Sequence, residues 1–218
     1  VHMLTASAKE YGVWLVGGSV SERAEDGKIY NTCVVVNPDG KIVGKHRKMH
    51  LFDIDVQKPK KMYFKESQTL TGGDSFTVVD TPWGKVGVGI CYDIRFPDMA
   101  IAMRQAGARL LVYPAAFNMV TGPAHWELLA RARAMDNQVF VALCSPACVT
   151  EEEGNTGYVA YGHSTVVDPW GEVRADLGTG ARVQVVECNL DRIDEVRASL
   201  PYWQQKRLDM YSSVKMRD

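Results

Sequence analysis

The sequence predicts an α/β fold in which helices pack outside β-sheets, and three observations support this prediction. Segments with helical periodicity alternate with short apolar runs of strand length along the 218 residues. Hairpins are inserted into this alternation, which a simple parallel barrel would not contain. Turn sequences rich in Asn, Asp, Pro and Gly join β-rich runs at residues 37–40, 81–84 and 168–171.

The first half of the chain is predicted to be mostly β-structure after one short helix. Residues 4–11 form the end of that helix, which stops near Gly12. A buried strand, the two arms of a hairpin and a strand of alternating Val or Ile and Gly are then expected at residues 13–16, 31–36, 41–44 and 86–90.

The second half is predicted to alternate between helices and strands. Helices are expected at residues 97–106, 123–135 and 191–199, the last with Asp191 as its N-cap and Pro201 after its end. Strands are expected at residues 109–113, 139–143, 164–167, 172–175 and 182–189. Residues 145–161 are polar and contain three consecutive acids, so we expect an exposed, mobile loop there.

Size and composition fit one globular domain spanning residues 1–218. Hydrophobic residues make up 46% of the chain and charged residues 23%, as in soluble proteins. The net charge of −1 argues against binding to nucleic acid or to an anionic membrane. No apolar run reaches the roughly 20 residues of a membrane-spanning helix.

Five cysteines at irregular spacing argue against a disulfide framework and for a reducing compartment. We therefore expect a cytoplasmic location, with the mitochondrion as the alternative. Cys144 and Cys148 are interpreted as structural rather than as zinc ligands, because no second ligand pair follows them. We expect no metal and no cofactor.

Cys91 ends the strand VGVGI and precedes a turn into the helix that begins at Pro97. A cysteine at such a turn can project its sulfur into a cleft, where backbone N–H groups surround it. That is a suitable place for a thiol nucleophile. The alternative is a buried structural cysteine, which is the common fate of this residue type.

Six sequence motifs decide between these alternatives, because together and in this order they are characteristic of one family. They are GGSVSE at 17–22, HRKMHLFDID at 46–55, FKES at 64–67, GICYDIRFPDMA at 89–100, YPAAFNMVTGPAHWELLARARAMDNQVFV at 113–141 and YGHSTVVDPWGEV at 161–173. The chain resembles the nitrilase superfamily of carbon–nitrogen hydrolases, and within it the omega-amidase branch.

The resemblance implies a four-layer α-β-β-α sandwich that forms a homodimer. It also implies hydrolysis of the omega-amide of small dicarboxylic acid monoamides, such as alpha-ketoglutaramate and succinamate, through a cysteine thioester, with water as second substrate. Two alternatives stay open: a nitrilase or N-carbamoyl amidohydrolase with the same catalytic groups, or a non-catalytic interaction module with this fold.

The family uses a Glu-Lys-Cys triad, and the resemblance assigns catalytic roles to Cys91, Lys48 and Glu66. Cys91 is the nucleophile, while Lys48 and the backbone N–H of Tyr92 stabilise the oxyanion. Lys48 also favours the thiolate. Glu66 orients Lys48. The alternatives are a surface lysine and an exposed loop carboxylate. A papain-like Cys–His pair has no support in the sequence.

The family's general base is a glutamate in a segment upstream of the region that this sequence covers. Glu10 and Glu22 do not lie in that motif, so we assign the role to neither. We expect the domain to be incomplete at its N-terminus and the chain to be a poor catalyst, because a general base contributes ~10²–10⁴-fold in rate.

Substrate binding is predicted from residues near Cys91 and after the next strand. Arg95 is expected to bind the distal carboxylate, since its planar fork matches that group. The alternative is an ion pair with Asp93 or Asp98. Phe117, Asn118 and Met119 follow a strand end and are expected to line the substrate pocket. Trp126 is assigned to the core.

Overall fold

The computed structural model describes residues 1–218 except 59–60, 151, 153, 155–156 and 212–218. Its helices are α1 (His2–Tyr11), α2 (Pro97–Gln105), α3 (Thr121–Asn137), α4 (Asp191–Ser199) and α5 (Leu208–Tyr211), with short 3₁₀ turns η1 (Glu66–Gln68) and η2 (Cys91–Arg95). No helix in the described part of the chain is long and apolar enough to cross a membrane.

The strands form three sheets. A three-stranded antiparallel sheet has the order β1-β2-β3, from β1 (Leu15–Arg23), β2 (Ile29–Val36) and β3 (Ile42–Arg47). A small hairpin pairs β4 (Asp53–Val56) with β5 (Met62–Lys65). The third has six strands in the order β11-β10-β9-β8-β7-β6: β6 (Thr77–Thr81), β7 (Gly84–Val88), β8 (Ala108–Pro114), β9 (Phe140–Cys144), β10 (Thr165–Val167) and β11 (Val173–Asp176).

The six-stranded sheet is mixed. Its central strands β7, β8 and β9 are parallel, and the connections between them are α2 and α3. The outer strands are antiparallel and joined by the hairpins predicted at residues 81–84 and 168–171. The α/β class with inserted hairpins is therefore confirmed.

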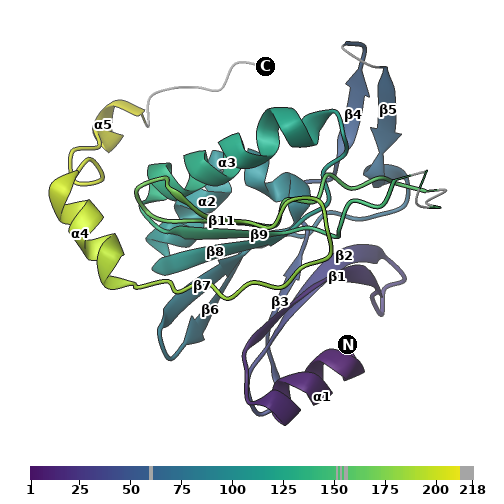
Figure 1. Ribbon diagram of the computed structural model, residues 1–218, viewed down its shortest axis with the longest axis horizontal. Coiled ribbons are helices and arrows are strands. Elements are labelled where there is room, and N and C mark those ends of the chain that lie inside the picture. The colour runs from purple at the N-terminus through teal and green to yellow at the C-terminus, as the bar shows by residue number, and fades with distance from the viewer. Residues whose placement is uncertain (59–60, 151, 153, 155–156, 212–218) are drawn as a thin grey trace.

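Four layers follow from the alternation of side chains along β2. Val34 and Val36 pack against Ala8 of α1, whereas Cys33 and Val35 pack against strands β6 and β7. Successive strand residues face opposite sides, so one sheet can bury both faces. On its other side the six-stranded sheet packs against α2 and α3, which together bury the largest apolar cluster. Figure 1 shows the resulting order of helices, sheet, sheet and helix, as the family resemblance implied.

Three of the predicted elements differ from the structure. Residues 182–189 form no strand; they run as an extended segment into α4, with Val183 and Val185 almost fully exposed, because no described strand lies beside them. Strand β1 begins at Leu15 and none of its residues is buried, since it lies at the edge of the three-stranded sheet in the described chain. Asp191 is the first residue of α4 rather than its cap; its N–H donates to the Asn189 side chain at 3.0 Å.

The loop after β9 falls partly outside the described residues. Its described part is not uniformly exposed: Tyr161 is half-buried, and the Tyr158 hydroxyl donates to the Ala116 carbonyl at 2.9 Å. The β4–β5 hairpin, which projects from the body in Figure 1, was not predicted from the sequence.

Candidate active site

Cys91 lies at a sharp turn where a central strand of the large sheet ends. Strand β7 stops at Val88, and Cys91 opens turn η2 with a backbone φ of +48°. Such strain at a non-glycine residue costs about 1–3 kcal/mol and is concentrated at functional sites. Gly89 lets the turn lie against the core, because a Cβ there would come within 2.5 Å of the Tyr113 ring. The predicted position of Cys91 at a strand end is confirmed.

Lys48 is buried and paired. It directly follows β3, its residue is 2% exposed, and its Nζ lies 2.5 Å from Oε2 of Glu66. The main chain is fixed as well, since the Lys48 N–H donates to Asn31 and its carbonyl accepts from Gly73, each at 2.8 Å. The interpretation of Lys48 as an ordinary surface lysine is therefore wrong.

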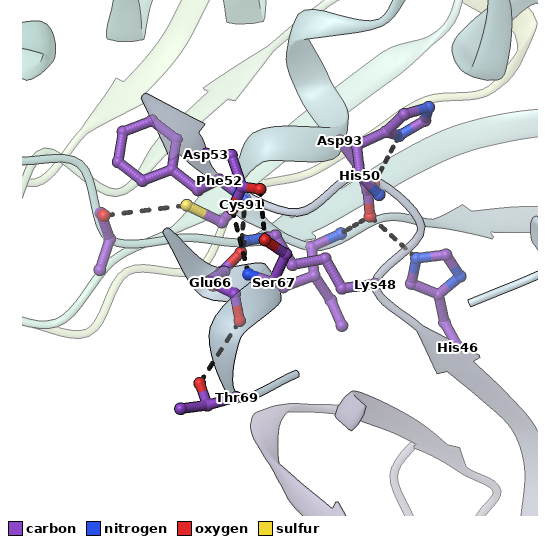
Figure 2. A network of polar contacts seen from close by, with 12 residues as sticks. His46, Lys48, His50, Phe52, Asp53, Glu66, Ser67, Thr69, Cys91 and Asp93 are labelled. Carbon is purple, nitrogen blue, oxygen red and sulfur yellow. Dashed lines mark hydrogen bonds and ion pairs between the residues drawn. The ribbon is translucent and has the colours of Figure 1, made fainter. Parts of the chain in front are cut away.

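Glu66 begins turn η1 directly after β5, and its side chain is 15% exposed. The same Oε2 atom that binds Lys48 also accepts the Phe52 N–H at 2.7 Å. Figure 2 shows these contacts between segments that are far apart in the sequence. Glu66 is thus held by the chain around it and holds Lys48, rather than being an exposed loop carboxylate.

Lys48, Glu66 and Cys91 line one cavity of about 820 Å³. Its wall also contains residues from the three-stranded and six-stranded sheets, from the β4–β5 hairpin and from the loops after β8 and β9. The predicted site residues in the wall are Lys48, Glu66, Cys91, Tyr92, Arg95, Phe117 and Asn118. Met119 is half exposed and is not part of this wall. The lining residues that the sequence did not suggest include Met62, Tyr63, Phe64, Cys144 and Tyr158.

Arg95 faces the cavity without a carboxylate partner in the described part of the chain. Its guanidinium lies 4.9 Å from the Phe117 ring centroid, and its Nη1 is 3.2 Å from Nδ1 of His125. Burial lowers the pKa of Arg95 from its ordinary value. Asp93 is occupied by other donors and Asp98 is exposed at the start of α2, so the ion-pair alternative for Arg95 is wrong.

The side-chain oxygen of Asn118 is hydrogen-bonded to the backbone of its own chain. Its Oδ1 accepts the N–H groups of Val120 and Thr121 at 2.9 and 2.8 Å, which starts α3. Its Nδ2 contacts the Met62 sulfur at 3.2 Å and so touches the β4–β5 hairpin. Met119, the next residue, is half exposed and is not part of the cavity wall.

The Cys91 thiol donates to the Ala116 carbonyl at 3.8 Å. Burial raises the pKa of Cys91, and the positive charge of Lys48 acts in the opposite direction without cancelling that effect. Lys48 was expected to favour the thiolate, and it does, but desolvation is the larger effect here. A thiol nucleophile at this position would therefore need a group that removes its proton.

The other residues considered as a proton acceptor for Cys91 are either bonded to other groups or absent from the described cavity wall. Glu22 accepts from Arg47 at 2.8 and 3.0 Å and from Thr32 and Lys45 at 2.6 and 2.9 Å, and the Arg47 hydrogen bond is the main reason that its pKa is lowered. No histidine is among the residues that line the cavity within the described chain. Glu66 is the one carboxylate in that described wall.

The buried carboxylate of Asp93 is hydrogen-bonded to both histidines of the sequence HRKMH. Its oxygens accept from His46 Nε2 at 3.0 Å and from His50 Nδ1 at 2.8 Å (Figure 2). These residues bond to one another, and no cluster of three or more His, Cys, Asp or Glu side chains suited to a metal occurs among the described residues. The spacing of both histidines around Lys48 was the signal in the sequence that could have revealed this network.

Trp126 belongs to the core, as predicted. It is 2% exposed and donates through Nε1 to the His163 carbonyl at 2.6 Å. This bond fixes α3 against the start of β10 behind the cavity wall. Trp126 therefore supports the wall from behind, through its edge contact with Phe117.

The chain is similar in sequence to a family model and to known proteins. The family model described as carbon-nitrogen hydrolase matches residues 1–198. "Omega-amidase NIT2-A" of Xenopus laevis is 54% identical over 99% of this chain and 76% of its own length. "Omega-amidase NIT2" of Homo sapiens is 53% identical over 96% of this chain and 73% of its own length.

Solved structures share the same architecture. Nit3 of Saccharomyces cerevisiae, described as a member of branch 10 of the nitrilase superfamily, is 44% identical with a TM-score of 0.80, over 94% of this chain and 70% of its own. The NitFhit protein of C. elegans is 34% identical with a TM-score of 0.82, over 95% of this chain and 50% of its own.

Proposed function

The chain belongs to the carbon-nitrogen hydrolase family, and we propose that it hydrolyses the omega-amide of small dicarboxylic acid monoamides through a Cys91 thioester. Identities of 53–54% to omega-amidases over almost the whole chain support this choice within the family. The observation in the structure that carries it is Arg95, a cation without a described carboxylate partner, in the same cavity as Cys91.

The reaction proceeds in two halves. The Cys91 sulfur attacks the amide carbon, its proton passes to the departing nitrogen, and ammonia leaves as the thioester forms. Water then attacks the thioester, so that the C–S bond breaks, the acid is released and the thiol regains a proton. Each half passes through a tetrahedral oxyanion that needs a positive group close by.

Lys48 and the backbone N–H of Tyr92 supply that positive group in our proposal. Lys48 is held at both its main-chain N–H and carbonyl and at its Nζ, so it does not have to reorganise when charge develops. Glu66 holds the ammonium in place. These three roles, with Cys91, make up the proposed triad and its oxyanion site.

Arg95 binds the distal carboxylate of the substrate. A half-buried guanidinium with no carboxylate partner among the described residues is poorly compensated, and a carboxylate that enters the cavity can form two parallel hydrogen bonds with it. Phe117 and Asn118 line the same cavity as Cys91 and Arg95. A neutral amide lacks the group that Arg95 selects.

The thiol proton limits how fast this site can work. Cys91 needs a base, and the one carboxylate in the described cavity wall, Glu66, is already bound to Lys48 and Phe52 through Oε2. We therefore propose that residues 1–218 turn over slowly. A homodimer and a cytoplasmic location stay predictions.

The direct test is ammonia release by the purified chain. Succinamate is the proposed substrate, and propionitrile and N-carbamoyl-β-alanine are the substrates of the two alternative enzyme classes. We expect ammonia from succinamate alone, and none from the Cys91→Ala variant. Turnover of the nitrile or the carbamoyl compound at the higher rate would replace the proposed substrate class, and no turnover of any of the three would favour the interaction module.

A further inference from the structure

Asp93 is a fully buried carboxylate that the reaction described above does not use. Its residue is 0% exposed, and its two oxygens accept four hydrogen bonds. Oδ1 accepts from the N–H and the Nδ1 of His50 at 3.0 and 2.8 Å. Oδ2 accepts from the Ile90 N–H at 2.8 Å and from His46 Nε2 at 3.0 Å.

These four donors come from the two segments that carry the proposed catalytic groups. Ile90 directly precedes Cys91, and Asp93 lies two residues after it. His46 and His50 lie two residues before and two residues after Lys48. One side chain therefore bonds both flanks of Lys48 and closes the turn at Cys91 (Figure 2).

The carboxylate form is needed for this arrangement. Burial by itself would raise the pKa of Asp93, but hydrogen bonds from His46 and the Ile90 N–H outweigh it, so the pKa lies below its ordinary value. An ionised carboxylate has about four acceptor positions on two oxygens, whereas an amide has one oxygen and an NH₂ that donates. Because each oxygen of Asp93 accepts two of the four hydrogen bonds, the NH₂ of an amide at this position would face two donors.

We propose that Asp93 is a positioning residue for the proposed hydrolysis, on which this inference rests: it holds the Lys48 segment and the Cys91 turn at a fixed separation, acting through His46 and His50. Neither histidine lines the cavity among the described residues, so the network works from behind the reacting groups. The network also supports the turn at Cys91, because the strained backbone φ of +48° at this residue must be maintained by the contacts around it.

Two other roles for Asp93 make different predictions about the Cys91 thiol. The charged groups around that thiol include Lys48, Glu66, Asp93 and Arg95; the two carboxylates raise its pKa while Lys48 lowers it. If Asp93 acted only through its charge, its removal would lower the pKa of Cys91. If it positions Lys48, its removal separates the thiol from that cation and the pKa rises. A merely structural role would change stability and leave the pKa unchanged.

The test compares Asp93→Asn with Asp98→Asn, a control that removes an exposed carboxylate from the adjacent helix start. For Asp93→Asn we expect kcat on succinamate to fall by about 10²-fold with KM unchanged, since misplacement by about 1 Å has that effect. The control should match the wild-type chain. An Asp93→Asn variant that keeps wild-type kcat, with an intact unfolding transition, overturns the proposal.

A second measurement does not depend on turnover. Alkylation of Cys91 by iodoacetamide, followed by mass spectrometry of its peptide, gives the thiol pKa from a pH series. Lys48→Met serves as the reference for loss of the cation, and Asp93→Asn should shift the pKa in the same upward direction. A downward shift, or none, contradicts positioning even if the chain folds normally.

His50→Phe keeps the inference testable if Asp93→Asn fails to fold. The substituted ring preserves the stack on Phe96, whose centroid lies 3.5 Å away, and the backbone N–H to Asp93 remains. Only the Nδ1 donor is lost, so we expect a smaller fall in kcat and a smaller rise in the pKa of Cys91. If the wild-type chain does not hydrolyse succinamate but these alkylation shifts occur, the proposed function fails and the positioning role stands.

Discussion

Two cations share the cavity with Cys91 and differ in how they are paired. Lys48 is almost completely buried and bound to Glu66 at 2.5 Å, whereas Arg95 contacts aromatic rings and His125 and has no carboxylate in the described chain. A cation fixed by its own carboxylate suits charge that appears only during reaction. An unpaired one suits charge that arrives with the ligand. In our proposal, this difference assigns catalysis to Lys48 and substrate recognition to Arg95 within one pocket.

The largest expected effect on activity comes from removing the Cys91 thiol, the proposed nucleophile in the cavity of both cations. Cys91→Ala should lower ammonia release from succinamate by at least about 10⁴-fold, because no thioester can form. The fold should persist, since the change removes one partly buried sulfur. Steady-state ammonia release checks the first expectation and thermal unfolding the second; activity in the folded variant would contradict the role of Cys91.

Lys48→Met tests the paired cation. We expect kcat to fall by about 10²–10³-fold, the usual cost of losing one oxyanion donor, with little change in KM. The reason is that the oxyanion exists only in the transition state and intermediates. Michaelis constants and turnover numbers for succinamate separate the two effects. An unchanged kcat with a raised KM would mean that Lys48 binds substrate and that the two cations do not differ in role.

Arg95→Lys tests the unpaired cation. Lysine keeps the charge but loses the planar fork, so we expect KM for succinamate to rise by about 10-fold, or about 1.4 kcal/mol, while kcat changes little. Inhibition by succinate, which has the carboxylates but no amide, should weaken in parallel. If kcat falls and succinate inhibition does not change, Arg95 supports the Cys91 turn instead.

The smallest effect on the kinetics is expected from removing Glu22, the partner of a third cation, Arg47, which precedes Lys48 in the chain. Arg47 points to the opposite side of β3 and pairs with Glu22, whose pKa it lowers. Glu22→Gln should cost about 1 kcal/mol of stability at pH 7 and leave the kinetics unchanged. Because the folded pKa of Glu22 is depressed, its contribution is complete above the unfolded value of about 4.3 and shrinks as pH falls below it.

Urea denaturation of wild-type chain and Glu22→Gln at a series of pH values checks this dependence. The difference in unfolding free energy should be largest near neutral pH and decrease toward acid. A difference that stays constant with pH would show that the loss comes from packing rather than from charge. A change in kcat would show that the two sides of β3 are coupled.

Much of the fold and the centre of the site could be predicted from the sequence. Turn chemistry predicted the hairpins, and alternating Val and Gly before Cys91 predicted a strand that ends at a sharp turn; the backbone strain at Cys91 was not predicted. The four layers and the pairing of Lys48 with Glu66 came from the family resemblance, because periodicity gives neither a layer count nor a contact between residues 18 positions apart.

The missed features depend on contacts between distant segments. Asp93 was interpreted as a possible partner of Arg95, but its four donors come from β3, the segment after β3 and the strand end before Cys91, and no local pattern encodes their approach. Residues 182–189 alternate like a strand, yet a strand requires a neighbour to pair with, and none is present in the described chain. Met119 was assigned to the pocket because it is adjacent to Asn118 in the sequence, but its side chain is half exposed and lies outside the cavity wall.

The most direct test of the difference between the two cations is the preference for succinamate over butyramide, its neutral counterpart. The ratio of their kcat/KM values should be measured for the wild-type chain, Lys48→Met and Arg95→Lys. We predict that Lys48→Met lowers both values and leaves the ratio unchanged, while Arg95→Lys lowers the ratio and leaves butyramide hydrolysis at its original rate. A ratio that changes in Lys48→Met, or that stays constant in Arg95→Lys, would contradict the assignment of catalysis to one cation and recognition to the other.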